Sequence, residues 1–185
     1  MKKLLILTLL FSLFQTNAQN FTRRDSLQGG MRFERSCYDV QRYDLNIKIN
    51  PEERNIVGYN EVTFDILQNT KKIQLDLFEN MNVDSIVFNK QKLTYKRDND
   101  AVFINFNSTL PQNSSQKLRF YYSGKPIIAK RAPWDGGFVF KKDSNGKDFI
   151  AVAVQGTGAS LWYPVKDSQT DEPDKGATIK VAVPN

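Results

Sequence analysis

The residues best suited to chemistry stand near the end of the sequence, in a loop that begins at Gln155. An apolar run, Phe149 to Val154, comes directly before it and predicts a buried strand. Small residues follow, including Gly156 and Gly158, which allow close approach of a backbone or a ligand. A glutamine amide oxygen can accept a hydrogen bond from an ammonium group without adding charge. Taken alone, the residues favour a simpler interpretation, in which Gln155 ends the strand and bonds the backbone.

The acidic residues downstream of this loop are interpreted as a turn. The 185-residue chain contains no histidine, which is the usual zinc ligand and the commonest general base, so a Ser-His-Asp or Cys-His site is excluded. Pro173 and Lys175 lie among the acidic residues, which favours a polar turn over the alternative of a metal site. The acidic residues are Asp167, Asp171, Glu172 and Asp174. We therefore expect no catalytic residue, no metal ligand and no cofactor in this chain.

The basic residues and the single cysteine limit the function classes further. The formal net charge is +6, and the Lys and Arg residues are scattered among Asp and Glu. A nucleic-acid surface requires clustered basic residues, so we expect no nucleic-acid partner and interpret the charges as solvated strand faces. Cys37 has no partner for an internal disulfide. We expect a small buried residue there, and the alternative is a free thiol that pairs between chains.

The elements that must position these residues are predicted to be strands. Polar and apolar residues alternate strictly from Tyr43 to Asn50, which predicts a strand with one buried face. Gly58 lies inside a second strand and indicates a bulge or a close backbone approach. Turn residues separate this second strand, at 56–66, from further strands at 72–78, 82–89, 90–96, 101–107, 116–122 and 178–183. The fold class is therefore all-β, as an antiparallel β-sandwich or a saddle-shaped curved sheet.

The first 18 residues are typical of a secretory signal peptide. Lys2 and Lys3 precede an apolar stretch, and Ala18 offers a cleavage point. The apolar stretch is shorter than the roughly 20 residues of a bilayer span. We therefore expect an exported protein, periplasmic or extracellular, without a membrane span after cleavage; an uncleaved anchor is the alternative. Residues 19–35 are predicted to be an irregular lead-in, and residues 127–147 a longer loop that contains Trp134.

An ordered set of residues in the second half resembles a known family. Its members are Gly136-Gly137-Phe138, Gln155, Tyr163-Pro164, Asp167, Glu172-Pro173, Lys175 and Val183-Pro184. The set resembles the end of the N-terminal β domain of zinc aminopeptidases of the aminopeptidase N and leukotriene hydrolase type, the first metallopeptidase family. The sequence departs from that pattern at Ala153, Ser160 and Val165, where the family usually has glutamine, arginine and cysteine. Weaker matches begin near the predicted first strand, so residues 36–185 are assigned to this domain.

The resemblance implies a role for the candidate loop. It implies that Gln155 holds the free amine of a peptide substrate and that Gly156 and Gly158 belong to the same substrate-binding site. It also implies a catalytic domain with zinc that is missing from this chain, which should be inactive alone. The expected function is the substrate-entrance domain of an exported zinc metallo-aminopeptidase. The alternative is a freestanding secreted β-sandwich module for binding or adhesion, with an exposed aromatic platform that includes Trp134 and Trp162.

Overall fold

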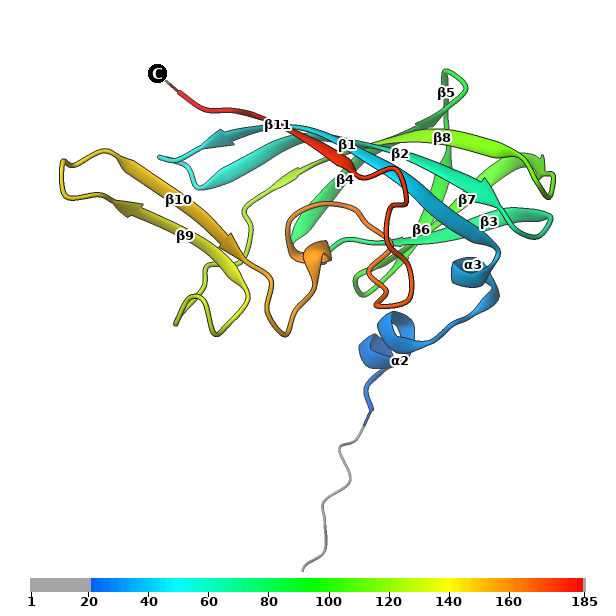
Figure 1. Cartoon of the computed structure of the whole chain (residues 1–185), viewed down its shortest axis with the longest axis horizontal. Coiled ribbons are helices and arrows are strands. Elements are labelled where there is room, and N and C mark those ends of the chain that lie inside the picture. Colours follow the sequence, from blue (N-terminus) through cyan, green and yellow to red (C-terminus); the bar gives the residue numbers. More distant parts are fainter. Residues whose placement is uncertain (1–20, 185) are drawn as a thin grey trace, which may run out of the picture.

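The computed structural model describes residues 21–184, so the predicted signal peptide at residues 1–18 lies outside the described residues. Strands dominate the chain, and short helices lie at its beginning and beside the candidate loop (Figure 1). The elements are α2 (Arg23–Gly29), α3 (Phe33–Ser36), β1 (Tyr38–Asn50), β2 (Asn55–Ile66), β3 (Thr70–Asp76), β4 (Met81–Phe88), β5 (Gln91–Lys92), β6 (Thr94–Asp98), β7 (Ala101–Leu110), β8 (Ser115–Gly124), β9 (Gly137–Lys142), β10 (Asp148–Ala153), the 3-10 helix η1 (Ala159–Leu161) and β11 (Ala177–Ala182). Within residues 21–184, no helix is long and apolar enough to cross a membrane.

The strands form three sheets. The largest has the order β11-β1-β2-β8-β4-β5, a second has the order β3-β7-β6, and β9 and β10 form a separate hairpin. Neighbouring strands are antiparallel, except that β11 runs parallel to β1 at the edge of the largest sheet. Figure 1 shows the β9–β10 hairpin at one end of the molecule, apart from the other two sheets. The all-β antiparallel prediction is confirmed.

The core lies between the six-stranded and three-stranded sheets. Buried side chains of both sheets form one apolar cluster. The Phe106 ring from β7 packs 5.1 Å from the Phe88 ring of β4 and 6.4 Å from the Phe64 ring of β2, measured between ring centroids. The predicted alternation in β1 is also confirmed, because Tyr43 and every second residue to Ile49 are buried. This face-to-face packing is that of a β-sandwich.

Gly58 is required by a close backbone approach and not by a bulge. It pairs with Ile47 of β1 in a continuous register. A Cβ atom at this position would lie 2.1 Å from the carbonyl oxygen of Asn46 and 2.8 Å from the Cα of Ile47. Of the two predicted explanations for this glycine, the structure selects the close approach. Cys37 is fully buried with a free thiol, which confirms its prediction as a small buried residue.

The predicted irregular lead-in at residues 19–35 is wrong where the structure describes it, because α2 and α3 lie there. Thr22 and Asp25 form a reciprocal capping box at the start of α2. Leu27 is the one residue of α2 that is buried, so the helix shows no apolar periodicity in the sequence. Short helices of this kind depend on tertiary packing, and their sequence signal is weak.

Two further predictions about the C-terminal third are wrong. The expected loop at residues 127–147 contains β9, which pairs with β10 along its whole length. The expected buried strand at 149–154 corresponds to β10, but it is largely solvent-exposed; 53% of Phe149 is accessible. β10 pairs only with β9 and belongs to neither sheet of the sandwich. Apolar composition therefore predicted a strand correctly at this position and its burial incorrectly.

Candidate functional site

The candidate loop projects Gln155 into solvent. After β10 the chain turns at Val154, whose carbonyl oxygen accepts hydrogen bonds from the backbone N–H groups of Thr157 (3.1 Å) and Gly158 (3.0 Å). Gly156 and Gly158 have φ values of 71° and 82°, which disfavour residues with a side chain. Gln155 is exposed at the tip of this turn. The two glycines are therefore required by the turn that displays the glutamine.

An open groove of about 680 Å³ lies beside the loop. One wall is the end of α2 and the residues after it, a second is the candidate loop, and the third is the acidic turn. The lining residues include Gln28, Met31, Gly156, Thr157, Gly158 and Asp167 to Thr170. The structure thus brings Gly156 and Gly158 together on one groove, whereas Gln155 does not line it. The three predicted site residues share a loop but face different surroundings.

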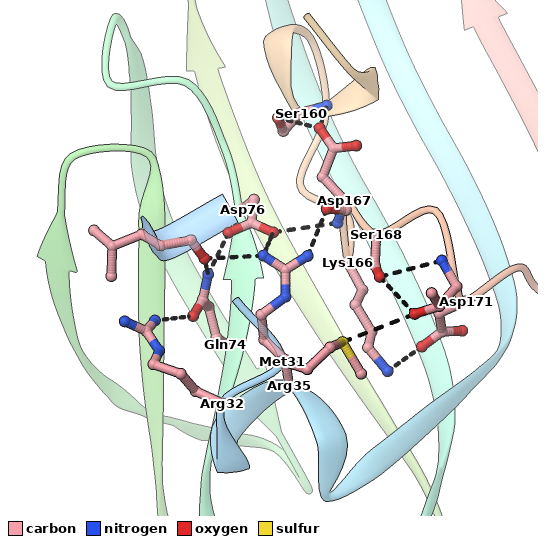
Figure 2. A network of polar contacts seen from close by, with 12 residues as sticks. Met31, Arg32, Arg35, Gln74, Asp76, Ser160, Lys166, Asp167, Ser168 and Asp171 are labelled. Atoms are coloured by element: carbon pink, nitrogen blue, oxygen red, sulfur yellow. Dashed lines mark hydrogen bonds and ion pairs between the residues drawn. The ribbon is translucent and has the colours of Figure 1, made fainter. Parts of the chain in front are cut away.

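Asp167 connects the acidic turn to the candidate loop. Its Oδ2 atom accepts hydrogen bonds from the backbone N–H (3.1 Å) and the hydroxyl (2.5 Å) of Ser160, the middle residue of η1. Its backbone carbonyl accepts a 2.5 Å hydrogen bond from Arg35 Nη2, and its backbone N–H donates to Asp76 Oδ2 at 3.2 Å. Figure 2 shows that these contacts reach Asp167 from Arg35 of α3, Asp76 of β3 and Ser160 of η1.

A buried ion pair lies beneath this junction. Arg35 Nη1 is 3.3 Å from Asp76 Oδ2, and the side chains are 1% and 0% exposed. Gln74 donates a 2.6 Å hydrogen bond to the other oxygen of Asp76. Burial raises the pKa of Asp76 from 3.8 to about 6, and the Arg35 guanidinium and the Gln74 amide act in the opposite direction.

A second buried ion pair fixes the other half of the acidic turn. Lys166 and Asp171 are paired, with each side chain 4% exposed. Lys166 Nζ also donates to the backbone carbonyl of Tyr38 at 2.7 Å and lies 4.4 Å from the centre of the Tyr38 ring. Asp167 and Asp171 thus bond groups of their own chain, as the polar-turn interpretation requires. Residues 21–184 contain no group of three His, Cys, Asp or Glu that could hold a metal ion.

These buried charges are the residues that sequence reasoning missed. Charges outside the acidic turn were expected on solvated strand faces, and this is wrong for Arg35, Asp76 and Lys166, which are each at most 5% exposed. Asp76 gave no warning of its burial, because Gln74 and Asp76 alternate with Ile73, Leu75 and Leu77 as residues on a solvated strand face do. Arg35 likewise shows no signal in the sequence, because its burial depends on a helix that was not predicted.

The aromatic residues of this region do not form the platform expected of a binding module. Trp134 is 73% exposed. Trp162 instead packs against the core, with its ring perpendicular to Tyr163 at 4.7 Å and to Phe138 at 6.2 Å between centroids. One tryptophan is thus available to a ligand and the other serves packing.

Comparison with known proteins identifies the family. Residues 40–185 match the peptidase M1 N-terminal domain, so the chain belongs to that family. No curated protein matches the chain. Among solved structures, the M1 zinc metallopeptidase from Deinococcus radiodurans is 22% identical with a TM-score of 0.60, and the alignment covers 80% of this chain and 32% of that one. A two-domain M1 zinc metallopeptidase variant bound to L-arginine is 23% identical, with a TM-score of 0.62 and coverage of 80% and 33%.

A more distant relative has the same fold. Leukotriene A4 hydrolase from Saccharomyces cerevisiae is 17% identical with a TM-score of 0.63, and the alignment covers 80% of this chain and 24% of that one. At these identities the structural likeness establishes the fold. The chain spans about a third of the length of the two metallopeptidases and about a quarter of the hydrolase.

Proposed function

We propose that this chain is the substrate-entrance domain of an exported zinc metallo-aminopeptidase whose catalytic domain lies outside these residues. The observation that supports it is the exposed Gln155, held at the tip of a glycine-containing turn in a chain of the M1 N-terminal family. The turn leaves the amide free of packing, so it is available to a group from outside the domain. The neighbouring groove is open and has room for part of a peptide.

Gln155 is proposed to bind the free α-amine of a peptide. Its amide oxygen is an acceptor suited to an ammonium donor, and a hydrogen bond to a charged partner is stronger than one between neutral groups. Gly156 and Gly158 have no side chains that would hinder a substrate near this amide. The reaction proposed for the complete enzyme is the removal of N-terminal residues from peptides.

The zinc is assigned to the catalytic domain. This chain has no histidine and one cysteine, and that cysteine is buried. The residues present therefore do not fit a zinc site of the hydrolase type, and no step of the chemistry is assigned to them.

Export is proposed from the basic and apolar pattern of residues 1–18. A mature N-terminus at Gln19, measured by mass spectrometry of the secreted protein, would support export, and retention of Met1 would contradict it.

The test compares two glutamine variants in the complete polypeptide that contains this chain. The substrates are an aminoacyl p-nitroanilide and its N-acetylated form, which lacks the charged amine. We expect cleavage of the free-amine substrate and a KM about tenfold higher for Gln155→Ala, because a charge-assisted hydrogen bond is lost. Gln112→Ala is the matched control, since Gln112 is exposed in a distant turn. Absence of cleavage, or an unchanged KM in Gln155→Ala, would contradict the proposal.

A further inference from the structure

The candidate loop is held at its far end and in its middle, and it is free at its tip. At the far end, Ser160 donates two hydrogen bonds to the Asp167 carboxylate. In the middle, the Thr157 side chain lies against Gly136, where an added Cβ would be 1.9 Å from the threonine hydroxyl oxygen. At Gly156 an added Cβ would meet no atom within 4 Å. The position of the tip is therefore determined by contacts at its flanks.

Asp167 is the flank contact with the strictest geometry. An added Cβ at Gly158 would lie 2.1 Å from Asp167 Oδ2 and 2.6 Å from Oδ1. The carboxylate thus packs directly on the backbone of the loop as well as bonding Ser160. A shift of Asp167 by a few tenths of an ångström would be transmitted to the loop, because no flexible side chain lies between them.

The main chain of Asp167 is held in turn by groups that cannot move easily. Arg35 donates to its carbonyl oxygen and Asp76 accepts from its N–H, so both backbone groups are bonded to one buried ion pair. The Arg35 side chain is also held by its 3.0 Å hydrogen bond to the backbone carbonyl of Leu27. A continuous chain of contacts therefore runs from α2, through the ion pair and Asp167, to the loop (Figure 2).

We propose that Asp167 is a positioning residue for Gln155, and that the Arg35–Asp76 ion pair fixes Asp167 so that the loop presents the glutamine amide at one height and angle. This inference rests on the proposed function of Gln155. Asp167 itself does not contact the substrate amine in this arrangement. Its carboxylate acts through Ser160 and Gly158. Asp167 therefore affects the binding of the amine only by determining the position of Gln155.

The test is a double-mutant cycle between Gln155→Ala and Asp167→Asn in the complete polypeptide. Asparagine keeps the size of the side chain but replaces the charged oxygen that accepts both Ser160 hydrogen bonds with a neutral amide oxygen, which is a weaker acceptor. We expect Asp167→Asn to raise KM for the aminoacyl p-nitroanilide several-fold, with kcat changed less than about twofold. The double variant is expected to match Gln155→Ala alone, because a displaced glutamine and an absent one lose the same hydrogen bond. Glu172→Gln, an exposed change in the same turn, is the charge control.

A second readout uses the same complete polypeptide and requires no activity. Hydrogen exchange at the Ser160 amide is expected to become at least tenfold faster in Asp167→Asn, while exchange in β2 stays unchanged. Unchanged exchange at Ser160 would overturn the inference whatever the kinetics. If Gln155→Ala raises KM but Asp167→Asn does not, or if the two effects multiply, the inference fails and the proposed function stands. If Gln155→Ala has no effect on KM, both fail.

Discussion

Strands β1 to β8, which form the two packed sheets apart from the edge strand β11, are stabilised by a different kind of contact from the C-terminal segment, Ile127 to Val183. In the sheets the buried side chains are almost all apolar, and Phe64, Phe120 and Leu75 are completely inaccessible. Burial of this kind is non-directional and contributes roughly 25 cal/mol for each Å² removed from water. The sandwich is therefore stabilised by the apolar area that it buries, and small shifts in geometry change that free-energy contribution little.

The C-terminal segment exposes much of its apolar surface. Phe149, Val152, Ile179, Val181 and Val183 are between 39% and 58% exposed, on β10, on β11 and beyond its end. Phe138 and Leu161 of this segment do join the apolar core. Its acidic turn is connected to the interior by buried hydrogen bonds and two ion pairs.

The contrast indicates which region contributes stability and which determines position. Buried ion pairs contribute little net stability, because desolvation offsets their attraction, yet they require definite distances and angles. The sandwich therefore supplies the free energy of folding, and the polar contacts supply the position of the candidate loop. Substitutions in the two regions are expected to differ accordingly.

The largest expected difference comes from the same substitution in both regions. Phe64→Ala removes a fully buried ring that packs edge-on against Tyr38, with 5.5 Å between centroids. It should lower the free energy of unfolding by about 4 kcal/mol. Phe149→Ala removes a half-exposed ring of β10 and should lower it by less than about 0.5 kcal/mol. Urea unfolding of both variants measures the two losses in unfolding free energy. Similar losses would mean that the hairpin belongs to the cooperative core.

Arg35→Met should have the next largest effect. The substitution leaves the buried Asp76 carboxylate without its cation and Asp167 without a donor to its carbonyl oxygen. We expect a loss of about 3 kcal/mol in the free energy of unfolding at pH 7. The double variant Arg35→Met/Asp76→Asn removes both charges and should recover part of this loss. A double variant no more stable than Arg35→Met would show that hydrogen-bond geometry dominates over charge.

The pH dependence of the Asp76 contribution follows from its raised pKa. Burial raises the pKa from 3.8 to about 6, so the native state retains a proton that the unfolded state has lost. The stability contributed by this group is present below about pH 4 and is lost as the pH rises to about 6. The difference in unfolding free energy between the unmodified chain and Asp76→Asn should therefore fall by at most about 3 kcal/mol across this window.

Two groups near Asp76 complicate that measurement, and the comparison with Asp76→Asn largely removes their contribution. They are Arg35, which lowers the pKa of Asp76, and Asp167, which raises it. Urea unfolding at pH 4 and pH 7 gives the two values required. A difference that grows with pH would mean that Arg35 outweighs burial and lowers the pKa of Asp76 in the folded chain.

The sandwich could be predicted from the sequence because its signal is local. The alternation from Tyr43 to Asn50 follows from the two-residue period of a strand, and one buried face is enough to reveal it. The hairpin shows the limit of that signal. Phe149 and its apolar neighbours correctly indicated a strand, but burial depends on where the other elements lie, and β10 pairs only with β9, outside both sheets of the sandwich.

The candidate site could be predicted only in part for a similar reason. The loop after the apolar run is a local pattern, whereas the assignment of Gln155, Gly156 and Gly158 to a substrate site came from the resemblance to a known family and stays a prediction. The contacts that hold this turn join residues far apart in the sequence, such as Arg35 with Asp167. The residue type alone does not distinguish a charged side chain that is buried in the fold from one that is solvated. Its partner becomes apparent only when the fold brings the two together.

Two glycines with similar backbone angles give the smallest and most selective test of the comparison. Gly146, in the β9–β10 turn, has a φ of 77° and nothing within 4 Å of an added Cβ, so Gly146→Ala should cost about 1 kcal/mol from the backbone alone. Gly158 has a φ of 82° but faces the Asp167 carboxylate, so Gly158→Ala should cost about 2 kcal/mol and should also speed hydrogen exchange at Ser160. Urea unfolding and amide exchange measure the two effects separately. Equal costs with unchanged exchange would mean that Asp167 moves aside freely, and the loop would then be held by its own turn and not by the polar contacts beneath it.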